Sequence, residues 1–129
     1  METMEERAEI AVDLKMNRGF NCAQAVTAAL SDLVTVIETD LRQITAGFCA
    51  GMGSMEATCG ALIGANIILG LATEGKGTLP LSRKLLEGFK RRCGALVCKD
   101  LKAIVDGKPV CPCADCVRNA VLALGDVLK

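Results

Sequence analysis

The chain has 129 residues, 15 basic and 15 acidic side chains, and no histidine, tryptophan or tyrosine. The zero net charge and the shortage of aromatic rings argue against nucleic-acid binding, which needs a basic surface and stacking platforms. Without histidine, imidazole-based catalytic triads, His-ligated zinc and His-ligated haem are excluded for this chain. With 51% hydrophobic residues and eight cysteines, the sequence predicts a folded protein whose chemistry depends on sulfur, carboxylate or amide groups.

The N-terminal sequence and the longest apolar run bear on location. The segment METMEERAEI is charged and lacks the apolar stretch of a signal peptide, so we expect a cytoplasmic protein. The apolar run over residues 59–72 is shorter than the roughly 20 residues that a membrane span needs, so we expect no membrane span. In a reducing compartment, eight cysteines favour metal, cluster or thiol chemistry over a framework of structural disulfides.

Helix signals follow one another along the chain, and strand alternation is nowhere convincing. Thr3 and Asn21 are the predicted caps of the first two helices, and Gly19 is expected to end the first. Further helices are predicted over residues 40–46, 59–73 after a Thr58 cap, 82–92 and 115–128, with a short helical turn after Cys98. The prediction is an all-α fold: a compact single-domain bundle spanning residues 1–129, of about five to seven helices, with the glycine-rich loop GFCAGMGS before the central helix.

Three cysteines come directly after residues that favour the N-cap position of a helix. The pairs are Asn21-Cys22, Thr58-Cys59 and Asp115-Cys116. The first amides of a helix have no intrahelical partner and the helix N-terminus is electropositive, so a thiolate there is stabilised. Cysteine is also common in cores as a small apolar residue. Because three cysteines share this position at a helix start, a functional role is favoured over a role as apolar core residues.

The other cysteines occupy different settings. Cys98 precedes the short helical turn, and Cys93 extends the apolar stripe of helix 82–92, where we expect it in the core. Cys49 lies in the glycine-rich loop, and its position is compatible with a place in the core or with a functional role. Cys111 and Cys113 form the segment CPCADC with Cys116, a spacing that suits a metal clamp or a thiol exchange pair. Pro112 could equally shape a turn, in which case Cys111 and Cys113 would have no functional role.

Three glycines, Gly60, Gly64 and Gly70, weaken the apolar helix behind Cys59, each by roughly 1 kcal/mol relative to alanine. Close packing of another helix would account for Gly64 and Gly70. For Gly60, next to the cysteine, we expect that the missing side chain gives a cofactor access to the sulfur. The amides of the loop GFCAGMGS could also point at a negatively charged sulfur cluster.

The segments NCAQAV, FCAGMG and CGALIG, followed by Cys98-x-x-Leu101 and Cys116, occur in a recognisable order. From about Phe20 to Cys116 the sequence resembles the family of small, cysteine-rich proteins named for the pattern C_GCAxxG_C_C and described as redox-active. The family cysteines correspond here to Cys22, Cys59, Cys98 and Cys116. The chain departs from the family in its Cys49-Ala50 dipeptide, where the loop is often richer in glycine, and in the additional Cys93, Cys111 and Cys113.

The resemblance implies an iron–sulfur cluster held by four cysteines. It also implies a redox partner protein, an oxidoreductase or a transporter component, because family members are often encoded near such proteins. The motif C-x-x-C-H for haem attachment is absent from the sequence, so haem is not expected.

Three functional hypotheses remain open at this point. The first is an electron-transfer protein whose iron–sulfur cluster is bound by Cys22, Cys59, Cys98 and Cys116, with Gly60 and Gly64 beside it and Cys111 and Cys113 as extra candidate ligands. The second is a thiol–disulfide oxidoreductase with Cys59 or Cys22 as nucleophile. The third is a zinc site with four cysteine ligands that stabilises a helical module for binding a partner protein. Helices with glycine faces are also compatible with a homodimer.

Overall fold

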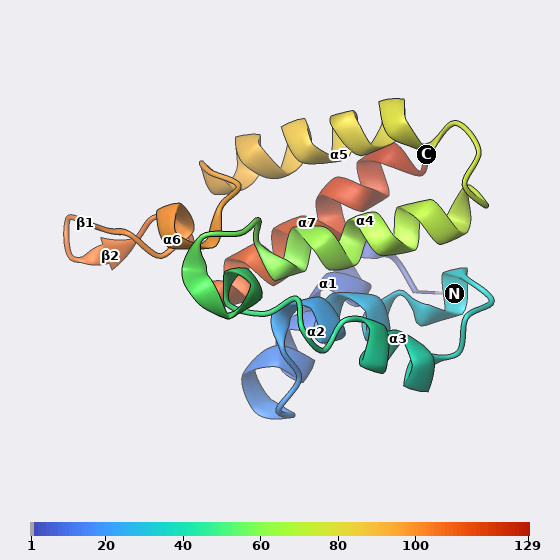
Figure 1. Ribbon diagram of the computed structural model, residues 1–129, viewed down its shortest axis with the longest axis horizontal. Helices are drawn as coiled ribbons and strands as arrows, with labels where there is room; N and C mark the ends of the chain where they lie inside the picture. Colours follow the sequence, from blue (N-terminus) through green and yellow to red (C-terminus); the bar gives the residue numbers. More distant parts are fainter. Residues whose placement is uncertain (1) are drawn as a thin grey trace.

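A computed structural model describes residues 2–129 as a bundle of helices with one small hairpin (Figure 1). The α-helices are α1 (Met4–Asn17), α2 (Cys22–Ala29), α3 (Glu38–Ile44), α4 (Gly60–Ala72), α5 (Thr78–Cys93), α6 (Cys98–Leu101) and α7 (Cys113–Val127). A 3-10 turn, η1 (Ser31–Leu33), and a π turn, η2 (Gly51–Met55), bring the number of helical segments slightly above the predicted range. The hairpin pairs β1 (Ile104–Val105) with β2 (Lys108–Pro109) in antiparallel orientation. The predicted all-α class is confirmed.

Helix α4 lies at the centre of the bundle. It packs against α2 on one side and against α5 and α7 on the other, while α1 packs against both α2 and α7 (Figure 1). The hairpin β1–β2 projects from one end of the bundle. The core is aliphatic, as the composition requires, and its largest fully buried apolar side chains are Phe89, Leu30, Leu41, Leu62, Ile68, Leu69, Leu85, Leu101, Leu124, Val26 and Val117.

Two predicted N-caps are confirmed. Thr3 Oγ1 accepts from the Glu6 N–H at 3.1 Å, and Glu6 Oε1 accepts from the Thr3 N–H at 3.0 Å. Asn21 and Gln24 make the same reciprocal pair at the start of α2, with distances of 2.7 and 3.1 Å. Each pair satisfies two amides that have no intrahelical partner. The second pair fixes Cys22 as the first residue of α2.

Two other predicted caps are wrong. Cys59 is itself the N-cap of α4, because Thr58 pairs with Val97 in an isolated antiparallel bridge. Helix α7 begins at Cys113, so Asp115 lies inside its first turn rather than at its cap. There the Asp115 carboxylate forms an ion pair with Arg118 at 2.6 Å.

Two helices begin earlier than the sequence predicted. Helix α3 begins at Glu38 rather than at residue 40, and α5 begins at Thr78 rather than at residue 82. Gly77 precedes α5 in a left-handed conformation (φ 66°). Pro80 is tolerated in the first turn of α5, because its missing N–H would have no intrahelical partner there. Among residues 2–129, no helix combines the length and the apolar character needed to cross a membrane.

Candidate functional site

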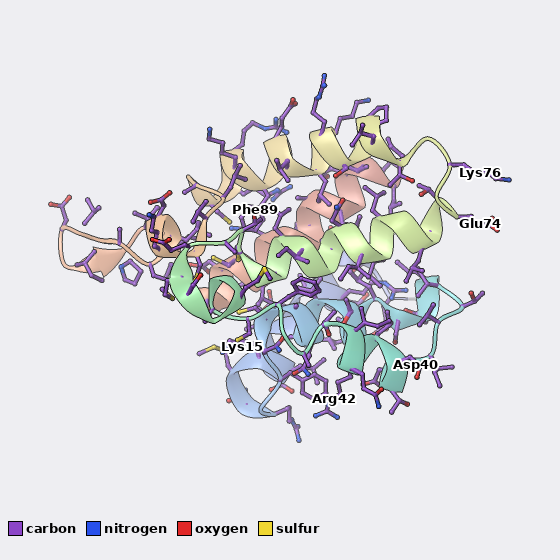
Figure 2. The ribbon with its side chains drawn as sticks, viewed as in Figure 1. Lys15, Asp40, Arg42, Glu74, Lys76 and Phe89 are labelled. Carbon is purple, nitrogen blue, oxygen red and sulfur yellow. The ribbon has the colours of Figure 1, made fainter. Side chains whose placement is uncertain are left out.

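Sulfur atoms gather at one end of the bundle, where several helices begin. Helices α2, α6 and α7 each begin with a cysteine, namely Cys22, Cys98 and Cys113, and Cys59 is the N-cap of α4. Figure 2 shows the sulfur atoms near Lys15, whereas Glu74 lies at the opposite end of the molecule. The free amides and positive ends of these helices are therefore close to the thiols.

A cavity of about 250 Å³ lies between these helix starts. Its wall is formed by Lys15, Cys22, Cys49, Ala50, Met55, Cys59, Gly60, Cys98, Lys102 and Cys113. Five of the eight cysteines thus line one cavity, together with two lysines. The rest of the lining is mostly apolar.

A short antiparallel bridge holds Cys59 and Cys98 on the cavity wall. The Cys59 N–H donates to the Leu96 carbonyl at 2.8 Å, and the Cys98 N–H donates to the Ala57 carbonyl at 3.0 Å. These two bonds join the segment before α4 to the segment before α6. Two cysteines far apart in the sequence are therefore fixed by backbone contacts, independently of any ligand.

The glycines of α4 differ in what they contact. At Gly60 a Cβ atom would lie 2.0 Å from the Phe48 carbonyl oxygen, so backbone packing requires glycine there, a contact that no local sequence pattern reveals. Gly60 is also part of the cavity wall. At Gly64 a Cβ would lie 2.9 Å from the Ala23 carbonyl oxygen, which confirms close packing of α4 on α2. Gly70 has no such neighbour within 4 Å, so the helix contact predicted for it is wrong.

The glycine-rich loop uses several amides internally. The N–H of Gly53 donates to the Cys49 carbonyl at 2.9 Å, and the N–H of Met55 donates to the Ala50 carbonyl at 2.9 Å. Both residues have left-handed backbone conformations, as Ala50 does. These two amides hold the loop in shape and are not free to face a ligand. The loop contributes the thiol of Cys49 to the cavity instead.

Cys59 has the environment of a readily ionised thiol. The interaction with the Cys116 thiol lowers the pKa of Cys59 to about 7, against the opposing effect of burial. The backbone amides of Ala61 and Leu62, at the start of α4, lower the pKa further. The predicted effect of a helix start on the Cys59 thiolate is therefore present, although Cys59 occupies the cap position itself.

Cys113 ionises still more readily. Its interaction with the Cys22 thiol, helped by the charges of Lys102 and Lys15, lowers the pKa of Cys113 to about 5 although burial opposes this. The same interaction, together with burial, raises the pKa of Cys22. Burial likewise raises the pKa of Cys98. The cavity wall thus combines thiols that ionise easily with thiols that stay protonated in the absence of a bound cation.

Lys102 links the cavity to the sulfur atoms behind it. Its Nζ donates to the Cys111 carbonyl at 2.9 Å and to Cys116 Sγ at 3.3 Å. Burial disfavours its charge, but Cys116 and Cys113 outweigh burial and raise the pKa of Lys102. Neither Lys102 nor Lys15 was singled out from the sequence, because lysine is not a metal ligand and no local pattern places it beside a cysteine.

A second group of thiols consists of three buried cysteines. The Sγ atoms of Cys93, Cys111 and Cys116 all lie within 4.8 Å of one another, close enough to hold a metal ion. Cys93 is 4% exposed, which confirms its predicted place in the core. Within residues 2–129, no three cysteines of the cavity wall are all as close to one another as these.

Three of the four cysteines implied by the resemblance line the cavity, and the fourth, Cys116, interacts with one of them, Cys59, from behind the wall. Cys22, Cys59 and Cys98 lie on the cavity wall. Cys116 is fully buried, and its thiol donates to the Cys111 carbonyl at 3.4 Å. Cys113, an extra candidate ligand from the sequence, lies on the wall of the cavity.

The chain belongs to the C_GCAxxG_C_C family. Residues 20–127 match this family, which carries the description "Putative redox-active protein (C_GCAxxG_C_C)". The match extends from the start of α2 to the end of α7 and confirms the resemblance found in the sequence. No curated protein and no solved structure gave a match to the chain.

Proposed function

We propose that this protein binds an iron–sulfur cluster in the cysteine-lined cavity and uses it to transfer electrons to a redox partner protein. The observation that carries the proposal is the presence of five cysteine thiols on the wall of one cavity of about 250 Å³. Four cysteine thiolates are the usual ligands of [2Fe–2S] and [4Fe–4S] clusters. A bound cluster would accept and release single electrons.

The spacing of the sulfur atoms favours a cluster over a single ion in the cavity. Thiolates that share one ion at about 2.3 Å lie roughly 4 Å apart. Within residues 2–129, no three cavity cysteines all meet even a 4.8 Å limit. In a [4Fe–4S] cluster each cysteine binds a different iron atom, so the ligand sulfurs need not all lie that close together.

We propose Cys22, Cys59 and Cys98 as three of the ligands. Cys113 is the best placed fourth: Cys49 also lies on the cavity wall, but it is in a loop, whereas Cys113 begins α7 and ionises readily. Cys116, the fourth cysteine implied by the resemblance, is not on the cavity wall; it interacts with Cys59, and its thiol donates to the Cys111 carbonyl.

The remaining wall residues would tune and shield the cluster. Lys15 and Lys102 bring positive charge to the wall and offset the negative charge of four thiolates and a cluster, and net charge is one determinant of reduction potential. Met55 Sδ lies 3.6 Å from Cys98 Sγ and contributes to the apolar lining. An apolar wall limits access of water to the ligands.

The test is anaerobic purification followed by absorption spectroscopy and assays of iron, zinc and acid-labile sulfide. The wild-type protein is expected to be brown and to contain iron and sulfide. Cys22→Ser, Cys59→Ser, Cys98→Ser and Cys113→Ser should each lose the visible absorption, whereas Cys93→Ser, the matched control at a buried cysteine outside the cavity, should keep it. Colourless, iron-free protein with intact thiols after reconstitution would overturn the proposal, and stoichiometric zinc would point to a structural site instead.

A comparison of two variants identifies the fourth ligand. Cys113→Ser is expected to lose the cluster while Cys116→Ser retains its visible spectrum. The reverse result would restore the ligand set implied by the family pattern, and it would require that Cys116 rotates toward the cavity when iron binds.

Thiol–disulfide exchange is a second candidate, favoured by the interacting pair of Cys22 and Cys113 thiols. The Cys113 thiolate would attack a disulfide of a partner protein and release one partner thiolate. Cys22, after losing its proton, would then displace the second partner thiolate, which leaves a Cys22–Cys113 disulfide and a partner reduced by two electrons. Iron-free protein should then reduce a protein disulfide, and Cys113→Ser should abolish this activity while Cys49→Ser leaves it unchanged. Absence of turnover in the iron-free wild type would exclude this candidate.

A further inference from the structure

We propose that Cys93, Cys111 and Cys116 form a second metal site, behind the cavity wall, that binds a single Cu(I) ion. The site does not depend on the cluster proposed above. Two of its three cysteines, Cys93 and Cys111, lie outside the cysteine pattern of the family. The inference is carried by the mutual distances of the three sulfur atoms and by the polar groups directed at them.

The three sulfur atoms already have nearly the spacing that one ion requires. All three lie within 4.8 Å of one another. Sulfur atoms in a plane around one ion at about 2.3 Å would lie roughly 4 Å apart, so small side-chain movements would complete the site. Cys93 and Cys111 are each 4% exposed and Cys116 is 0% exposed, so water has little access to the sulfurs.

The site joins three parts of the chain whose backbones are fixed. Cys93 is the last residue of α5, Cys111 follows the hairpin, and Cys116 lies at the start of α7. The Cys111 N–H donates to the Leu101 carbonyl at 2.9 Å, and the Cys116 N–H donates to the Pro112 carbonyl at 2.9 Å. Helices α5 and α7 also pack against each other. A bound ion would therefore link α5 and α7 without a rearrangement of the backbone.

Two side chains donate hydrogen bonds to the sulfur atoms. Lys102 Nζ lies 3.3 Å from Cys116 Sγ, and Asn119 Nδ2 lies 3.4 Å from Cys93 Sγ. Among the ion pairs of residues 2–129, none joins Lys102 to a carboxylate. When an ion displaces the protons of these thiols, donors of this kind stabilise the resulting thiolates.

The number and type of ligands select the ion. Soft thiolates favour Cu(I), zinc and iron–sulfur clusters. Structural zinc is almost always bound by four ligands, whereas within residues 2–129 no fourth cysteine or carboxylate completes this group. Three buried thiolates suit a three-coordinate monovalent ion. The complex would carry two negative charges, of which the Lys102 ammonium offsets one.

The test is an anaerobic titration of reduced protein with Cu(I) in competition with a chromophoric Cu(I) chelator. The titration uses a Cys22→Ser/Cys113→Ser background, which removes the interacting pair of cavity thiols and leaves three of the five cavity cysteines. One Cu(I) per chain is expected to bind tightly. Adding Cys93→Ser or Cys111→Ser should weaken Cu(I) binding by roughly 100-fold or more. Even the loss of a residue that only hydrogen-bonds a metal ligand lowers metal affinity about 10- to 100-fold. Adding Cys49→Ser, the control, should change nothing.

X-ray absorption spectroscopy identifies the copper ligands without any substitution at Cys93, Cys111 or Cys116. The copper-loaded Cys22→Ser/Cys113→Ser protein should show three sulfur neighbours and no second metal nearby. Far-UV circular dichroism of each serine variant establishes that it is folded. Copper affinity that is unchanged by both Cys93→Ser and Cys111→Ser, or a spectrum with two or four sulfur neighbours, would overturn the proposal.

Discussion

Gly60 is constrained by one backbone atom. The Phe48 carbonyl oxygen would lie 2.0 Å from a Cβ at position 60, and because the obstacle is backbone, no side-chain rotation can relieve the clash. Gly60→Ala should therefore lower the free energy of unfolding by about 1–3 kcal/mol, the usual cost of overpacking. At Gly70 a Cβ would meet no atom within 4 Å, so Gly70→Ala should be stabilising by about 0.5–1 kcal/mol. Urea unfolding followed by circular dichroism measures both, and equal effects would contradict the clash.

Arg7 is a buried charge whose partner is exposed. Its side chain is 2% exposed, whereas that of Asp32 is 60% exposed. Both guanidinium Nη atoms bond the Asp32 carboxylate, one of them at 3.0 Å, and Nη1 also donates to the Ala29 carbonyl at 3.4 Å. Hydrogen bonding to Arg7 lowers the pKa of Asp32 below its ordinary value of 3.8. The pair therefore stabilises the fold fully above pH 3.8, and this contribution is lost as the pH falls through the lower, folded-state pKa.

Asp32→Asn should show this dependence directly. At neutral pH it is expected to lower the free energy of unfolding by about 1–3 kcal/mol, because Arg7 loses a charged hydrogen-bond partner. Below pH 3.8 the difference between wild type and variant should shrink. Asp13→Asn, at an exposed pair with Arg18, is the control and should change the stability less than Asp32→Asn does at neutral pH. Denaturant unfolding over a pH series provides the measurement, and a constant difference at all pH values would refute the assignment.

At the scale of the elements, the caps of α1 and α2 offer a matched comparison. Thr3→Ala and Asn21→Ala each remove a reciprocal cap and should each lower the free energy of unfolding by about 1 kcal/mol. Asn21 also donates to the Ala46 carbonyl at 3.2 Å and directly precedes Cys22 on the cavity wall. Asn21→Ala should therefore also reduce the iron content of purified protein, whereas Thr3→Ala should not. Equal iron contents would mean that the start of α2 does not position Cys22.

These two caps were predictable from sequence because all of their atoms belong to one short segment. Thr58 was assigned as a cap for the same reason, but its backbone pairs with Val97, a partner that no local pattern reveals. Asp115 looked like a cap residue as well, yet α7 begins at Cys113 and the carboxylate of Asp115 bonds Arg118 instead. Local signals thus located the helices, and the long-range pairing of Thr58 with Val97 decided where α4 begins.

At the scale of the whole molecule, the sequence identified part of the candidate site. Cys22, Cys59 and Cys98 were expected together from the family pattern, and the structure places all three on one cavity wall. Lys102 and the close group formed by Cys93 with Cys111 and Cys116 were not anticipated. Their positions depend on how α5, α6 and α7 pack, which spacing along the chain does not encode.

Occupancy of the cavity should stabilise the entire bundle, because its wall is built from α1, α2, α4, α6 and α7 and from the glycine-rich loop. A ligand that binds only the folded state adds about 2.7 kcal/mol when present at roughly 100 times its Kd, and a tightly held cluster should add at least that much. Anaerobic calorimetry is therefore expected to show a higher unfolding temperature for cluster-loaded protein than for the same protein stripped by a chelator. The Cys22→Ser/Cys113→Ser protein, treated identically with iron and sulfide, should unfold at one temperature with or without the chelator. If loaded and stripped wild type unfolded at the same temperature, the iron would not be bound by a wall that joins these helices, and the cavity would lose its assignment.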